Sequence, residues 1–194
     1  MRCVLTWSAR LRWATSRVPR RSAERELSRL LSAGDLEGTG WRKLDERAWR
    51  TGKSGNDAPW ALRAREAGLL TAWRSFEQTG AQRWMWAQIS PLVSVSDADE
   101  ALSTSADRFL RNFRATVTVV EHVDAQPLEL SGQPSGWAFQ QRTHGPKGEG
   151  ESLYCGFVVG QTVAVLAASA LRGSWDWPEL QRVAQRQADL LDTQ

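Results

Sequence analysis

Histidine, cysteine, methionine and tyrosine are scarce in this sequence of 194 residues, which contains two, two, two and one of them respectively. Cys3 lies in the N-terminal segment and Cys155 lies within a hydrophobic stretch, so the pair makes a poor disulfide framework. Two cysteines and two histidines without ligand spacing also argue against a zinc site. The glycine fingerprint of a dinucleotide site is missing as well. We therefore expect no cofactor and no metal.

With so few histidines, the candidates for a general acid or base near neutral pH are His122 and His144. His122 adjoins a glutamate within a predicted strand, where neighbours point to opposite faces and do not form a dyad. His144 lies with Lys147 in a predicted loop at 144–150. The serine-hydrolase turn G-x-S-x-G is missing, and the Gly-Lys-Ser sequence at 52–54 lacks the earlier glycine of a phosphate-binding loop. These absences predict a non-catalytic binding or interaction module, with a small enzyme built around the His144 loop as the alternative.

Long hydrophobic runs are also missing. No apolar run approaches the ~20 residues that a membrane-spanning helix needs. No secretory signal peptide and no lipid-attachment motif can be recognised. The sequence therefore predicts a cytoplasmic protein, with export or membrane association as the alternative.

Acidic residues are absent from residues 1–21, and residues 1–29 carry eight arginines against two glutamates, a net charge of +6. The whole chain carries +3, so the remainder is mildly acidic at −3 and predicts no basic face for nucleic acid. We expect residues 1–21 to be a disordered arm or to precede the true start of the protein. The alternatives are contact with an anionic membrane or with phosphates. The arginines available for such contacts are Arg10, Arg12, Arg17, Arg20 and Arg21.

Tryptophan, in contrast, is abundant, with eleven residues spread along the chain. One interpretation is a stacking surface for sugars or bases. The other is that the indole rings fill the core at the starts of strands and helices. The candidate residues for binding a ligand or partner are Trp84, Trp86, Trp137, His144 and Lys147.

Alternating and helical hydrophobic patterns divide residues 22–192 into the elements of one domain. Segment 41–49 is either a short strand or an irregular packing segment, and 51–59 has the composition of a loop. Strands are predicted at 71–79 and 83–92, which form a hairpin, and at 115–123, 137–143, 153–159 and 162–168, and helices at 23–32, 96–112 and from 177 onward.

Two of these helices have recognisable starts. Asp176 is a favourable N-cap, followed by Pro178 in the first turn and by Glu179 at the capping-box position. Asp97 and Glu100 have the same spacing at the start of the helix at 96–112. The final helix carries a narrow apolar stripe, which consists of Leu180, Val183, Ala184, Gln187 and Leu191.

The order of elements lacks the strict alternation of strand and helix that is typical of a parallel sheet. We therefore predict an α+β fold, a single antiparallel sheet of about five to seven strands with helices packed against it. The last three strands form a meander that is followed by the capped helix.

Three stretches of this layout carry a resemblance to a known group. They are the sequence LLSAGDL at 30–36, the run from the hairpin at Trp73 into the helix at 97–110, and segment 139–168 with the helix that begins at Asp176. In this order the elements resemble PsbP-like α+β domains, which occur in actinobacterial lipoproteins and in extracellular sensor domains of some actinobacterial kinases. The resemblance implies an actinobacterial source and partner binding without catalytic residues. Unlike exported members of that group, this sequence shows neither a signal peptide nor a lipobox.

Overall fold

The computed structural model describes residues 18–193 with internal gaps at 53–57, 115–117, 125–127, 129, 132–135, 146–147 and 172–174. For residues 107–114, 118–124, 145, 148 and 171 it describes the backbone alone. The part of the predicted arm that contains Arg10, Arg12 and Arg17 lies outside the described residues.

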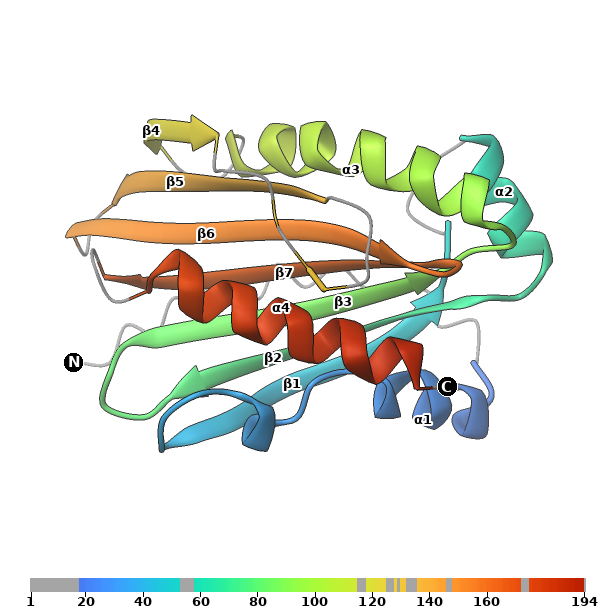
Figure 1. The fold of residues 1–194 in the computed structure, drawn as a ribbon, viewed down its shortest axis with the longest axis horizontal. Helices are drawn as coiled ribbons and strands as arrows, with labels where there is room; N and C mark the ends of the chain where they lie inside the picture. The colour runs from blue at the N-terminus through green and yellow to red at the C-terminus, as the bar shows by residue number, and fades with distance from the viewer. Residues whose placement is uncertain are drawn as a thin grey trace.

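Seven strands form one sheet in the order β1-β2-β3-β7-β6-β5-β4, and every neighbouring pair is antiparallel (Figure 1). Helices pack on both faces, so the predicted α+β fold with a single antiparallel sheet is confirmed. The strands are β1 (Trp41–Arg50), β2 (Leu70–Gln78), β3 (Arg83–Pro91), β4 (Thr118–Asp124), β5 (Trp137–Gly145), β6 (Gly148–Val159) and β7 (Thr162–Leu171). The helices are α1 (Arg20–Ser28), the 3-10 helix η1 (Ala33–Asp35), α2 (Pro59–Glu66), α3 (Val95–Arg114) and α4 (Trp177–Asp192).

The main core lies between the sheet and α4, which crosses in front of the strands in Figure 1. We call this side of the sheet the α4 face. The predicted stripe of α4 is confirmed, because all five of its residues are buried. The predicted cap is confirmed too, because the Asp176 carboxylate accepts the Glu179 N–H at 2.7 Å. From the sheet, the largest buried contributions come from Phe76, Met85, Ile89, Leu153, Phe157 and Leu166.

The strand predictions are close to the observed strands. The β2–β3 hairpin turns at Gly80 and the β6–β7 hairpin at Gly160, and both glycines have positive φ, which suits tight turns. Segment 41–49 is a strand, β1, at one edge of the sheet. It carries many charged side chains, which discourage pairing with another chain at an open edge.

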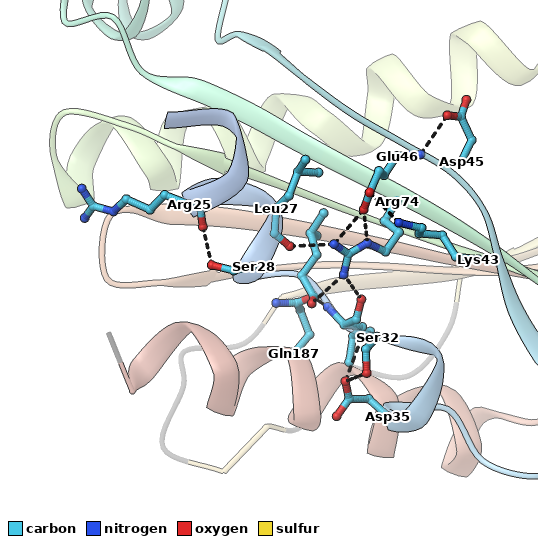
Figure 2. A network of polar contacts seen from close by, with 12 residues as sticks. Arg25, Leu27, Ser28, Ser32, Asp35, Lys43, Asp45, Glu46, Arg74 and Gln187 are labelled. Atoms are coloured by element: carbon cyan, nitrogen blue, oxygen red, sulfur yellow. Dashed lines mark hydrogen bonds and ion pairs between the residues drawn. The ribbon is translucent and has the colours of Figure 1, made fainter. Parts of the chain in front are cut away.

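The guanidinium of Arg74, on β2, hydrogen-bonds three backbone carbonyls at 2.7–3.2 Å, that of Leu27 in the last turn of α1 and those of Leu30 and Leu31 just after it. Figure 2 shows Arg74 between these carbonyls and the Glu46 carboxylate, which accepts from its Nε at 3.0 Å. The last carbonyls of a helix have no partner within the helix and carry its negative dipole end. Arg74 therefore fixes α1 to the sheet.

Gln187, fully buried on α4, holds the same segment from the other side. Its side-chain oxygen accepts the Leu31 N–H at 3.1 Å, and its side-chain nitrogen donates to the Arg29 carbonyl at 2.8 Å. A buried polar side chain needs such partners to offset its loss of water. The segment from Leu27 to Leu31 is thus pinned between β2 and α4.

Two helix predictions need correction. The first helix spans Arg20–Ser28 instead of 23–32, because Leu30 and Leu31 leave the helix to enter the core. Arg20 and Arg21 accordingly belong to α1. The predicted loop at 51–59 ends in an unpredicted helix, α2, which Pro59 begins in a position that suits its fixed φ.

Helix α3 begins at Val95, and its start differs from the prediction. The hydroxyl of Ser94 accepts the Asp97 N–H at 3.1 Å, so the cap is Ser94 and not Asp97. The Asp97 carboxylate instead pairs with Arg63 of α2, whose Nε lies 3.2 Å from both carboxylate oxygens. This ion pair joins α2 to the start of α3.

The predicted loop at 144–150 is also wrong. β5 continues to Gly145 and β6 begins at Gly148, so His144 lies in a strand and pairs with Glu149. Residues 146–147, and with them Lys147, lie outside the described residues. The glycines at 148 and 150 indicated a loop, but they pair with Gly145 and Thr143 of β5, so here glycine weakens the strand without ending it.

Replacing Asp176 by alanine removes the cap of α4. We expect Asp176→Ala to lower the free energy of unfolding by about 0.5–2 kcal/mol, because the Glu179 N–H loses its acceptor. Denaturant unfolding measures this loss. The control is Asp192→Ala, a carboxylate in the last turn of the same helix, which should not destabilise the protein. Equal unfolding curves for both variants and the wild type would show that the cap contributes nothing.

Replacing Arg74 by methionine keeps the length of the side chain but removes its donors. We expect Arg74→Met to cost about 2–4 kcal/mol, because buried carbonyls at the end of α1 lose a charged partner. The control is Arg42→Met, whose guanidinium pairs with Glu77 at the surface and should change stability by less than about 1 kcal/mol. Similar losses for the two variants in denaturant unfolding would contradict the central role of Arg74.

The Arg63 pair makes stability depend on pH. Hydrogen bonding and charge from Arg63 lower the pKa of Asp97 below its ordinary value of 3.8, in spite of desolvation. The folded state therefore binds a proton here less readily than the unfolded state, and the stability from Asp97 is present above pH 3.8 and lost as pH falls below it. We expect the stability difference between wild type and Asp97→Asn to be constant near neutral pH and to shrink in acid. In denaturant melts across pH, Asp99→Asn serves as the exposed control; a difference that does not change with pH would contradict the expectation.

Candidate binding face of the sheet

The strands carry five tryptophans on the side of the sheet opposite α4, and we call this side the tryptophan face. Trp49 lies on β1, Trp73 on β2, Trp84 and Trp86 on β3, and Trp137 on β5. On β3, Met85, Ala87 and Ile89 alternate with Trp84 and Trp86 and enter the core of the α4 face, so the two tryptophans point to the opposite side. The strand register places the other tryptophans on that side too. Three of the five predicted binding residues, Trp84, Trp86 and Trp137, thus share a face.

One line of directly paired residues across this face is mainly polar. We define the polar row as Glu77, Ser169, Ser152 and Gln141, which lie on β2, β7, β6 and β5, with Trp84 of β3 between Glu77 and Ser169. The hydroxyls of Ser152 and Ser169 are 2.9 Å apart and hydrogen-bonded. The row exists because β3 pairs with β7, which brings Trp84 next to Ser169, 85 positions later in the chain.

The next line of paired residues is mainly aromatic. We define the aromatic row as Trp86, Ala167, Tyr154 and Phe139, from β3, β7, β6 and β5. The rings of Phe139 and Tyr154 are stacked with centroids 4.9 Å apart, and Trp137 stacks on Phe139 at 5.3 Å. Trp86 packs against this cluster from the other side of the small Ala167.

Helix α3 covers one part of the tryptophan face. Its residues Ala98 and Ala101 pack with Val158, Val163 and Val165 of β6 and β7. Further along the helix, the Trp137 indole N–H donates to the Leu102 carbonyl at 3.2 Å and to the Ser105 hydroxyl at 2.9 Å. Trp137 is therefore an anchor of α3 as well as a member of the face.

The Trp137 ring lies flat on β6 at Gly156. A β-carbon at this glycine would come within 2.5 Å of the indole ring, so only glycine leaves room for the ring. The close approach lets Trp137 stack on Phe139.

Over much of β1, β2 and β3 the tryptophan face is open, while Thr71 at the start of β2 is buried and Trp86 packs against the cluster of α2 and α3. In the described part of the chain, the helix that packs extensively on β1 and β2 is α1, and it lies on the α4 face, where Arg74 points. Trp84 is 42% exposed, and Trp73, Trp86 and Gln88 are half-buried. The polar and aromatic rows thus run from buried residues on β5 and β6 out to a solvent-facing surface on β3.

At the covered end of the polar row, the Gln141 side chain is 1% exposed. Neither its amide nitrogen nor its amide oxygen has a hydrogen-bond partner among the described residues. Most buried amides are hydrogen-bonded, and an unsatisfied one costs about 1–3 kcal/mol. Beside it, burial raises the pKa of Tyr154 despite a hydrogen bond with Ser152, so the phenol stays neutral at physiological pH.

The ionised residues on the open surface are paired with each other. Glu77 pairs with Arg42 of β1, and Asp45 pairs with Arg47, also on β1. The surface is therefore polar and balanced in charge.

His144 lies apart from these rows. Trp137, Phe139 and Gln141 point to the tryptophan face, so alternation along β5 directs His144 to the opposite face, where it is exposed. Within the described chain, no cluster of three or more His, Cys, Asp or Glu side chains is suited to hold a metal, and no helix is long and apolar enough to cross a membrane.

Sequence reasoning missed Ser152, Ser169, Tyr154 and Gln141 as members of the candidate site. A signal for two of them was present, because Ser152 and Tyr154 alternate with the apolar residues Leu153 and Cys155 on β6. That period-two pattern separates the two faces of the strand. The pairing of β7 with β3 had no comparable local signal.

Comparisons with known proteins give a likeness in fold. No protein-family model matches the sequence, and no related curated protein is found. Among solved structures, the chain is similar to the extracellular domain of PknH from Mycobacterium tuberculosis, with a TM-score of 0.58 over 89% of this chain and 97% of that domain. The sequence identity is 11%, so the likeness concerns the fold alone. It agrees with the extracellular-domain part of the predicted resemblance, while the PsbP-like part stays a prediction.

Proposed function

We propose that the protein is a non-catalytic binding module that holds its ligand on the open part of the tryptophan face. The observation that carries this proposal is the exposed Trp84 beside the half-buried Trp86, at the point where the polar and aromatic rows reach solvent. Binding sites commonly combine aromatic surface with a few placed polar groups. The unpartnered amide of Gln141 adds polar capacity at the covered end of the same row.

The likeness to an extracellular domain supports a role in which binding is sensed at the cell surface. It favours export over the cytoplasmic location predicted from the sequence, and it is in line with an actinobacterial, PsbP-like protein. In this proposal residues 22–192, together with Arg20 and Arg21 of α1, act as one domain, and the residues before them attach or extend it.

The two alternatives from the sequence receive less support. His144 is exposed at a strand end on the other face, away from the rows of polar and aromatic residues. A catalytic site would need further groups positioned around it. In the other alternative the basic arm attaches the protein to an anionic surface. Of the arginines named for this contact, the structure describes Arg20 and Arg21, which are exposed on α1.

The test compares wild-type protein with Trp84→Ala, since Trp84 is exposed and its removal should leave the fold intact. Both proteins are immobilised and incubated with the small-molecule fraction of an extract from the source organism. Retained compounds are then eluted and identified by mass spectrometry. We expect at least one compound that wild type retains and Trp84→Ala loses.

The matched control is Trp177→Ala, a tryptophan truncation on the α4 face, which should retain the same compound as wild type. Identical compounds on wild type and Trp84→Ala, or none on either, would overturn the proposal for this face.

A further inference from the structure

The charge of the open surface limits what it can bind. Glu77 of β2 and Asp45 of β1 are each paired with an arginine of β1. Glu77 is the ionised side chain that β2 and β3 carry on this face. A polyanion such as nucleic acid is held by cations that are free to contact phosphates. The balanced pairs on this surface favour a neutral ligand.

The arrangement of rings favours a ligand with flat apolar faces. Trp84 and Trp86 are two residues apart on β3, which places them about 6.6–7 Å apart along the strand on one side. Trp73 is a diagonal neighbour of Trp86, because their cross-strand partners are Gln88 and Ser75. Three indoles therefore form a platform across β2 and β3.

Neutral hydrogen-bonding groups surround the platform. Ser169 pairs directly with Trp84, Ser75 with Trp86, and Gln88 with Trp73. Each ring thus has a hydroxyl or amide beside it. A lipid chain or an apolar helix would bury the remaining donors and acceptors of these groups without partners, which is costly.

We infer that the ligand is a neutral oligosaccharide, an inference that rests on the proposed function of this face. A pyranose ring offers apolar C–H faces to an indole and hydroxyls around its edge to serine and glutamine side chains. Successive rings of the chain lie on Trp84 and Trp86, and the polar row continues the contacts toward Ser152. Nucleic acid, anionic glycans and lipid surfaces are the competing ligand classes.

The experiment measures binding by isothermal titration calorimetry with neutral hexasaccharides of glucose, N-acetylglucosamine, mannose, xylose and arabinose. Heparin, oligo(dT) and phosphatidylglycerol vesicles represent the competing classes. We expect at least one neutral hexasaccharide to bind, with a Kd that stays within about twofold between about 0.05 and 0.5 M salt, because no ion pair is formed.

The variants locate the sugar on the platform. Trp84→Ala should raise the Kd at least about tenfold, while Trp84→Phe, which keeps a ring, should recover part of the affinity. Ser169→Ala should raise the Kd severalfold, and Trp177→Ala on the other face should leave it unchanged. Thermal melts of each variant confirm that it is folded.

The inference is overturned if none of the neutral hexasaccharides binds, if binding is confined to the anionic probes, or if Trp84→Ala binds sugar as wild type does. A failure here differs from a failure of the proposed function. Should the extract experiment yield a compound that depends on Trp84 and is not a saccharide, the binding face stands and its ligand class changes.

Discussion

The hydrogen bonds of Arg74 are the constraint on which the arrangement of layers depends. The chain between α1 and η1 passes through the core with its backbone carbonyls turned inward, where water does not reach them. A charged guanidinium is a stronger donor than a neutral group and can serve several carbonyls at once. Since Gln187 of α4 bonds the same segment, β2, α1 and α4 meet at one place. The core of the α4 face is thereby closed, and the helices that pack on the tryptophan face are α2 and α3.

The helices on the tryptophan face, α3 with the short α2 beside it, leave part of this face open, because the sheet is much wider than a helix. Seven strands at about 4.8 Å spacing span about 29 Å, whereas a helix with its side chains is about 10–12 Å across. On the α4 face, α1 and the segment around Leu128 and Leu130 add to the cover that α4 provides. On the tryptophan face α3 packs on β6 and β7 and is held at its start by Arg63 and further along by Trp137. The open surface over β1–β3 follows from this difference.

The sequence was informative wherever structure is local. The alternation of residues in β2 and β3 and the cap at Asp176 predicted a hairpin and a helix start that the structure confirms. Prediction from the sequence was wrong where contacts between distant residues determine the structure. Leu30 and Leu31 continue a helical pattern but leave the helix, since Arg74 and Gln187 offer their backbone other partners. The candidate site depended on long-range pairing, because Trp84 meets Ser169 only through the contact of β3 with β7.

The structure also explains why two interpretations of the many tryptophans were both reasonable. Trp41 and Trp175 enclose the Arg83 guanidinium, whose carbon lies 5.6 and 3.8 Å from their ring centroids, and Glu179 of α4 pairs with the same group. These rings therefore join β1 and β3 to the start of α4. Trp84 has no such role, and among the described tryptophans it is the exposed one. Rings that fill the core or join its elements are occupied by packing, so the proposed function assigns ligand binding to the rings that the helices leave uncovered.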